Sequence, residues 1–116
     1  MGLDITITIK TTSHDFCKRN WLIPFVEKAI GKEIENCEEY ELSKETMFDL
    51  LDRIDKVLAD HDLAEELLPT QDGYFYGSTQ YNDWYFENLQ DAKYRLEEDV
   101  KSMDDNETAI FWSWWW

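Results

Sequence analysis

The chain has 116 residues, of which 26 are acidic and 11 basic, giving a formal net charge of −15 at pH 7. The length predicts a single domain over residues 1–116, and the 16% of aromatic residues argues against a disordered chain. This balance disfavours direct nucleic-acid binding, which needs a basic patch, and it disfavours contact with anionic membrane surfaces.

The charge is unevenly distributed along the chain. Residues 1–35 hold five acids and five bases, so residues 36–116 carry the whole −15. We therefore expect one strongly negative face. Two cysteines are too few for a disulfide framework, and neither a signal peptide nor a membrane-length apolar run is evident. These features predict a cytoplasmic protein.

The first third of the sequence predicts a strand and a helix. Residues 3–10 alternate between apolar and polar side chains, which is typical of a half-buried strand. The polar residues 11–20 predict a loop. Residues 21–30 predict a short helix capped by Asn20 and ended by Gly31. The acidic residues 32–42 predict a second loop.

The clearest helix begins at Ser43, a good N-cap residue. Apolar residues recur after it at helical spacing as far as Leu58. The sequence Asp60-His61-Asp62 predicts a break, after which one or two more helical turns end at Pro69.

Residues 67–89 read LLPTQDGYFYGSTQYNDWYFENL and combine turn residues with seven aromatic residues. They predict a short strand at Tyr74–Tyr76 and a long helix capped by Ser78 or Thr79. The expected buried face of that helix comprises Tyr81, Tyr85, Leu89, Ala92, Leu96, Val100 and Met103. Residues 108–116 predict a Trp-rich strand. The sequence therefore predicts an α+β fold, with about three helices packed on a small, mostly antiparallel sheet of about three strands.

Four segments carry a resemblance to known sequences: Met1-Gly2-Leu3-Asp4, the run from Ala64 to Thr70 (AEELLPT), the run from Gly73 to Thr79 (GYFYGST) and the run from Tyr81 to Phe86 (YNDWYF). Together they resemble a family of small phage and prophage proteins of unassigned activity. Members of that family typically open with GLDM, continue with ELLPT and a GFFFGSTEYDEWYF-like stretch, and end in an aromatic strand. The resemblance implies an accessory protein of a mobile element that acts in the cytoplasm of a bacterial host.

Acidic residues recur along the predicted long helix. Asp83, Glu87 and Asp91 follow one another at i+4, about 6 Å apart at 1.5 Å per residue. This spacing is comparable to that of phosphates along a nucleic-acid strand. One interpretation is that the acids mimic nucleic acid and enter a basic groove on a host protein. The alternative is an acidic face that only keeps the protein in solution.

Aromatic residues supply candidate anchors for a partner protein, because such side chains dominate interface hot spots. We select Tyr76, Trp84 and Trp115. On an alternating strand, Trp114 and Trp116 share one face and Trp115 the other, but the sequence leaves open which of the two faces is inward. A helix covering each face of the strand is the alternative.

The sequence predicts no catalytic residue, cofactor or metal site. His14, Cys17, Cys37 and His61 supply four potential zinc ligands but form only one tight pair. A thiolate dyad of Cys17 with His14, or of Cys37 with His61, is the enzymatic alternative.

The predicted function is non-enzymatic binding to a host protein with a basic surface, most specifically inhibition of a nucleic-acid-handling or defence protein, in the manner of an anti-CRISPR. No direct nucleic-acid or membrane contact is expected. The alternatives are a structural or homodimeric subunit joined by aromatic residues, and an enzyme with a Cys/His site.

Overall fold

The computed structural model describes residues 2–72 and 78–116. Within them it contains four strands and four α-helices, which confirms the predicted α+β class. The elements are β1 (Leu3–Ile9), β2 (Thr12–Asp15), α1 (Leu22–Ile30), β3 (Glu39–Ser43), α2 (Lys44–Ala59), the 3₁₀ turn η1 (His61–Leu63), α3 (Ala64–Leu67), α4 (Asp83–Lys101) and β4 (Thr108–Trp115). The predicted strand Tyr74–Tyr76 lies outside the described residues.

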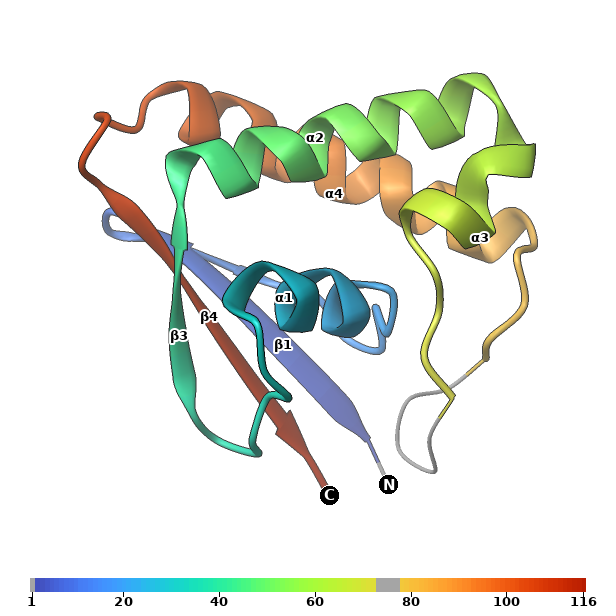
Figure 1. The fold of residues 1–116 in the computed structure, drawn as a ribbon, viewed down its shortest axis with the longest axis horizontal. Helices are drawn as coiled ribbons and strands as arrows, with labels where there is room; N and C mark the ends of the chain where they lie inside the picture. The colour runs from blue at the N-terminus through green and yellow to red at the C-terminus, as the bar shows by residue number, and fades with distance from the viewer. Residues whose placement is uncertain (1, 73–77) are drawn as a thin grey trace.

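The strands form one antiparallel sheet in the order β2-β1-β4-β3, with the first and last strands of the chain at its centre (Figure 1). Two of these strands occupy segments for which the sequence predicted loops, 11–20 and 32–42, and there the prediction was wrong. Both are edge strands that bury few side chains. The β3 sequence Glu39-Tyr40-Glu41-Leu42-Ser43 does alternate, but it has two apolar residues and only Leu42 is fully covered, so the signal is weak within the acidic segment.

One face of the sheet is covered by the helices, and the hydrophobic core lies between them. The alternation predicted for the first strand is present: Leu3, Ile5, Ile7 and Ile9 are buried against the helices, and the residues between them are not. Figure 1 shows α1 in front of the sheet, with α2 and α4 side by side across one end of it. None of the helices in the described ranges is long and apolar enough to cross a bilayer.

Helix α1 ends where predicted but begins differently. Gly31 closes it with φ +75°, and its amide donates to the Glu27 carbonyl. The N-cap is Trp21, without a side-chain cap, so the prediction of an Asn20 cap was wrong. The buried Asn20 amide Nδ2 donates to the Ser78 carbonyl at 2.8 Å instead, which joins the start of α1 to the segment before α4.

Helix α2 follows the sequence closely. The Ser43 hydroxyl accepts the Thr46 amide hydrogen at 3.1 Å, as expected of an N-cap. The helix stops at Ala59, and the predicted break is the 3₁₀ turn η1, in which the Asp60 carboxylate accepts from the Asp62 amide at 3.1 Å.

Helix α4 begins later than predicted. Its cap is Asn82, whose Oδ1 accepts the Tyr85 amide hydrogen at 3.1 Å, so the predicted cap at Ser78 or Thr79 was wrong. The predicted buried face is largely confirmed. Tyr85, Leu89, Ala92, Leu96 and Val100 are buried within the helix, and Met103 is buried just beyond it.

Candidate functional site

The second face of the sheet is not covered by any described helix. We call it the open face, comprising Asp4, Thr6, Thr8, Ser13, Asp15, Glu39, Glu41, Ile110, Trp112, Trp114 and Trp116. In β4 the inward residues Ala109, Phe111 and Ser113 are buried, whereas Trp114 and Trp116 are 41% and 46% exposed. A sheet face that carries three tryptophans in sequence alternation is unusual for a solvent-facing surface.

Strand register places acids beside these tryptophans. Trp112 lies opposite Thr6 on one neighbouring strand and Glu39 on the other, and Thr6 lies opposite Asp15. One row across the sheet therefore reads Asp15, Thr6, Trp112, Glu39. The Thr6 hydroxyl donates to the Asp15 carboxylate at 3.0 Å, which orients that carboxylate along the face.

Two shallow hollows flank Trp112. The first, of about 360 Å³, is lined by Thr6, Thr8, Cys37, Glu39, Ile110 and Trp112. The second, of about 400 Å³, is lined by Asp4, Thr6, Asp15, Cys17, Arg19 and Trp112. We call them the Glu39 hollow and the Asp15 hollow. Both hollows are lined by Trp112 together with carboxylates from other strands of the sheet.

Trp114 and Trp116 form a stacked pair with ring centroids 4.5 Å apart. The Trp116 ring lies directly over Gly2, where a Cβ atom would come within 2.5 Å of the indole. Gly2 and Trp116 also exchange two backbone hydrogen bonds, at 3.0 and 3.2 Å. Glycine at position 2 therefore leaves the space that the Trp116 ring occupies.

The residues predicted as aromatic anchors are distributed differently. Trp115 points to the helix-covered side, where it is partly buried against the core, and its backbone exchanges hydrogen bonds with the Asn36 side chain. Trp84 lies in the first turn of α4 and is 42% exposed. Tyr76 lies outside the described residues. The alternation of β4 thus places Trp114 and Trp116, not Trp115, on the uncovered face.

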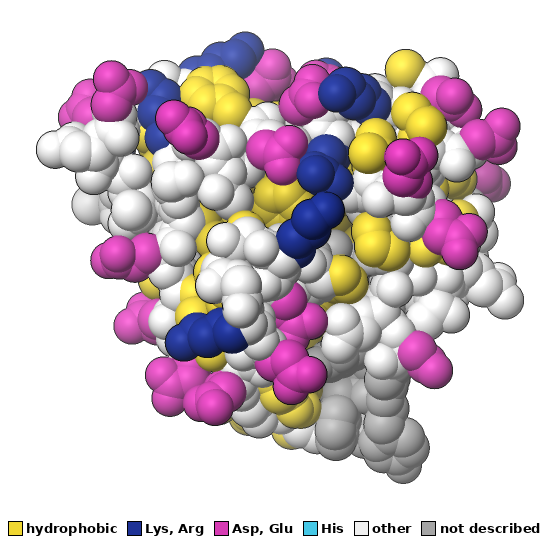
Figure 2. Space-filling view, viewed as in Figure 1, with side chains coloured by type: hydrophobic (Ala, Val, Ile, Leu, Met, Phe, Trp, Pro, Cys, Tyr) yellow, Lys and Arg dark blue, Asp and Glu magenta, His cyan; other side chains and the backbone are white. Residues whose placement is uncertain are grey.

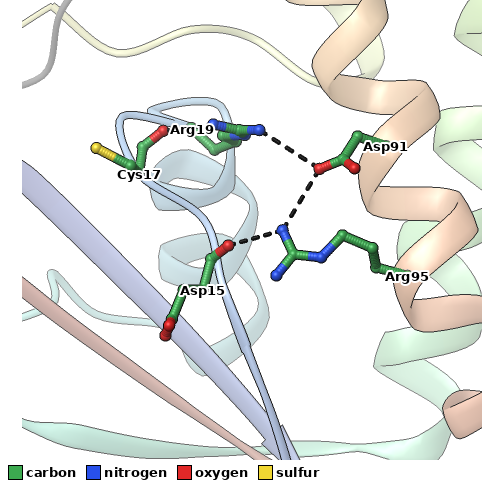
Figure 3. Close-up of polar contacts among 5 residues, drawn as sticks. All are labelled: Asp15, Cys17, Arg19, Asp91 and Arg95. Carbon is green, nitrogen blue, oxygen red and sulfur yellow. Dashed lines mark hydrogen bonds and ion pairs between the residues drawn. The ribbon is translucent and has the colours of Figure 1, made fainter.

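The predicted acidic series on α4 is exposed at its first two members. Asp83 and Glu87 are exposed, but Asp91 is held between two arginines, with Arg19 Nη2 and Arg95 Nη1 each 3.4 Å from its Oδ2 (Figure 3). The Asp91 charge is therefore already compensated within the protein. On the side shown in Figure 2, carboxylates are interspersed with lysine and arginine side chains.

The same arginines hold the edge of the Asp15 hollow. Arg95 Nη1 donates to the Asp15 carbonyl at 2.7 Å, and Arg19 Nη1 donates to the Cys17 carbonyl at 2.8 Å (Figure 3). The Arg95 guanidinium also lies over the Phe16 ring, 4.5 Å from its centroid. These contacts hold residues 15–19 against α4. They join distant parts of the sequence, since Arg19 and Asp91 are 72 positions apart. Sequence periodicity carries no signal for such a pairing.

The cysteines and histidines are not assembled into a catalytic pair in the described residues. His14 hydrogen-bonds to Asp99 at 2.6 Å, and His61 stacks on Phe86 with centroids 3.6 Å apart. Burial and the neighbouring Asp4 carboxylate raise the pKa of the Cys17 thiol, which disfavours the nucleophilic thiolate. No group of three His, Cys, Asp or Glu side chains within residues 2–72 and 78–116 is arranged to hold a metal ion.

A further hollow of about 430 Å³ lies on the helix side, between α1, the start of α2 and the segment around α3. Phe25, Leu67 and Pro69 contribute its apolar lining, while Lys28 and Arg53 stand beside Glu45, Asp49 and Glu66. The Arg53 side chain is bonded to both the Asp49 carboxylate and the Leu67 carbonyl. Because this hollow combines basic and acidic side chains, and Arg53 is already paired within it, the hollow indicates no particular class of ligand.

No protein-family model, curated protein or solved structure matches this chain. The resemblance to small phage and prophage proteins therefore stays a prediction, and the functional conclusions below rest on the geometry of the open face.

Proposed function

We propose that this protein acts without catalysis, by docking its open face on a basic surface of a host protein. The observation that carries the proposal is the uncovered series Trp112, Trp114 and Trp116 on β4, bordered by carboxylates from the other three strands of the sheet. Buried tryptophans supply much of the affinity at protein interfaces. A charged border sets orientation and speeds association with a surface of opposite sign.

In its most specific form, the proposal is that a phage or prophage accessory protein inhibits a host nucleic-acid-handling or defence protein in the bacterial cytoplasm. Proteins that handle nucleic acid present lysine and arginine where phosphates bind. A chain with net charge −15 competes for the same surface. The segments that resemble phage and prophage proteins support a bacterial host as the setting.

The test compares two tryptophans of equal exposure on different elements. Trp114 on the open face and Trp84 on α4 are 41% and 42% exposed, so leucine substitutions at these positions remove similar area. Tagged wild type and both variants are used to capture proteins from bacterial lysate at low and high salt. A captured basic protein is then purified, and its affinity for each form of this chain is measured by calorimetry.

We expect Trp114→Leu to weaken binding by about tenfold or more, the scale of an interface hot spot, and Trp84→Leu to leave it nearly unchanged. Binding should weaken as salt rises, because the border contacts are charged. Addition of the wild-type chain should also release nucleic acid from the partner. Loss of binding in Trp84→Leu, with Trp114→Leu unaffected, would transfer the contact to α4 and overturn the open-face proposal.

Self-association is the second candidate, favoured by the exposed Trp114–Trp116 stack. Two open faces in contact would, however, bring the Glu39 and Glu41 side of one copy against the acids of the other. Such a dimer should strengthen with salt, opposite to the behaviour expected for a basic partner. Sedimentation equilibrium of wild type and Trp114→Leu at two salt concentrations separates these cases.

A further inference from the structure

This inference rests on the proposed function and specifies the chemistry that the partner presents. We infer that Trp112 is a two-sided arginine site: the partner places one guanidinium group in the Glu39 hollow and a second in the Asp15 hollow. The indole of Trp112 lines both hollows and would lie between the two guanidinium groups.

Both hollows are negatively charged and therefore suit a cation. The Glu39 hollow contains a single charged side chain, Glu39. The Asp15 hollow contains the carboxylates of Asp4 and Asp15, and the Arg19 guanidinium at its edge is paired with Asp91, so the hollow keeps a negative charge. Arg19 does not occupy this hollow as a ligand would, because its guanidinium is bonded to Asp91 and to the Cys17 carbonyl.

The geometry of the hollows favours arginine over lysine. A guanidinium group is planar, so it can stack on an indole while its edge donates two hydrogen bonds to a carboxylate. Register places Glu39 directly beside Trp112, and neighbouring strands lie about 4.8 Å apart. A group stacked on Trp112 is therefore within reach of the Glu39 carboxylate. Thr6, common to both hollows, holds the Asp15 carboxylate by its hydroxyl on the other side.

A second copy of this chain does not supply these groups. The chain has three arginines, and each is bonded within the protein: Arg19 to Asp91, Arg53 to Asp49 and Arg95 to the Asp15 carbonyl. The open face otherwise presents carboxylates, hydroxyls and apolar side chains. The complementary surface is thus basic and belongs to another protein, in which two arginines stand close together.

The test uses the full chain and three short peptides as probes. The first is acetyl-Gly-Arg-Gly-Arg-Gly-amide, the second replaces both arginines with lysine, and the third replaces them with citrulline, which has nearly the same shape without the charge. Binding is followed by ¹H–¹⁵N NMR of the indole groups, with the Trp112 signal assigned from Trp112→Leu. Titration extends to about 10 mM, the weak limit of measurable affinity for such small ligands.

The arginine peptide should shift the Trp112 indole signal and bind about threefold to tenfold more tightly than the lysine peptide, and the citrulline peptide should not bind. Glu39→Gln and Asp15→Asn should each weaken the arginine peptide by about threefold, since each removes one charged partner. Glu87→Gln on α4 is the control and should change nothing.

Equal binding of the arginine and citrulline peptides, an unmoved Trp112 signal, or no binding up to the highest concentration would overturn the inference. Trp112→Leu keeps apolar bulk in the sheet but has no aromatic face, and retained arginine preference in this variant would overturn it too. If a basic partner still requires Trp114 while the peptides show no preference for arginine, only this inference fails. If Trp114→Leu leaves partner binding intact, the proposed function itself fails.

Discussion

Replacing Asp91 with asparagine tests whether this acid stabilises the fold or serves a partner. Its carboxylate holds Arg19 and Arg95 at 3.4 Å each, and through them the segment 15–19 that borders the Asp15 hollow. Asparagine keeps the shape and one acceptor oxygen but removes the charge. Both arginines then lose their shared carboxylate.

The expected cost follows from exposure. Partly exposed ion pairs contribute about 0.2–1 kcal/mol each, and the Arg19 side chain, only 18% exposed, lies toward the upper end of that range. Because asparagine still accepts a hydrogen bond, we expect a loss of about 1 kcal/mol in the free energy of unfolding. An unfolding entropy of about 2.1 cal/mol/K per residue converts this into a Tm lowered by about 4 °C.

Glu87→Gln is the matched control, since Glu87 is an exposed acid one turn earlier on the same helix. Removing its charge relieves repulsion from its i±4 neighbours Asp83 and Asp91, so its Tm should stay within about 1 °C of wild type or rise. Thermal unfolding by circular dichroism at low and high salt measures both. The difference between Asp91→Asn and wild type should shrink as salt rises.

Equal Tm values for Asp91→Asn and wild type at low salt would refute this reasoning, because the two arginine contacts would then contribute nothing. A normal Tm combined with impaired partner binding would return Asp91 to the exposed acidic series predicted from the sequence. A lowered Tm with partner binding unchanged is the result that the structure leads us to expect.

Three further predictions concern local hydrogen bonds. Tyr85→Phe removes a buried 2.7 Å bond to the Leu68 carbonyl and should cost about 1–3 kcal/mol in urea unfolding. Burial, and secondarily Tyr81, raises the pKa of the Tyr85 phenol, so above pH about 10 the unfolded chain releases a proton that the folded chain keeps. The free energy of unfolding of the wild type should then fall with rising pH, and its excess over that of Tyr85→Phe should become smaller. An excess that stays constant above pH about 10 would contradict a pKa raised by burial. Because Asn82 caps α4, Asn82→Ala should lower the free energy of unfolding by about 1 kcal/mol in the same assay, and Thr79→Ala should lower it much less. A larger loss for Thr79→Ala would instead support the cap predicted from the sequence. Ser43→Ala should likewise lower the free energy of unfolding by about 1 kcal/mol. An unchanged urea midpoint would show that the 3.1 Å hydrogen bond from the Thr46 amide to the Ser43 hydroxyl contributes nothing to stability.

The central elements of the fold could be predicted because their patterns are set by burial. The first strand alternates and the second helix has both a cap and an apolar stripe, so local sequence and tertiary packing agree. The edge strands were missed for different reasons. Thr12–Asp15 has no buried residue and no apolar alternation. Glu39–Ser43 does alternate, but it has only two apolar residues, Tyr40 and Leu42, inside an acidic segment, so its signal is weak.

The candidate site depends on which side of β4 faces inward, and the sequence misleads on that point. Ser113 is the one polar residue between Phe111 and Trp116, which would favour placing it, and Trp115 with it, toward solvent. In the structure Ser113 is fully buried beside the inward residues of β1, and the larger tryptophans occupy the other face. Only the pairing of β4 with its neighbours determines this orientation. The compensation of Asp91 is equally hidden, because one of its partners lies 72 residues away.

The position of β4 at the centre of the sheet has a consequence for synthesis. β1 and β3 do not pair with each other; each pairs with β4, which comes last in the order of elements. During translation the sheet therefore cannot close until residues 108–115 have left the ribosome, and the apolar sides of β1, α2 and α4 stay without their full cover until then. A nascent chain stalled before Thr108 would be a substrate for chaperones and proteases, and only chains extended past β4 could become competent for binding.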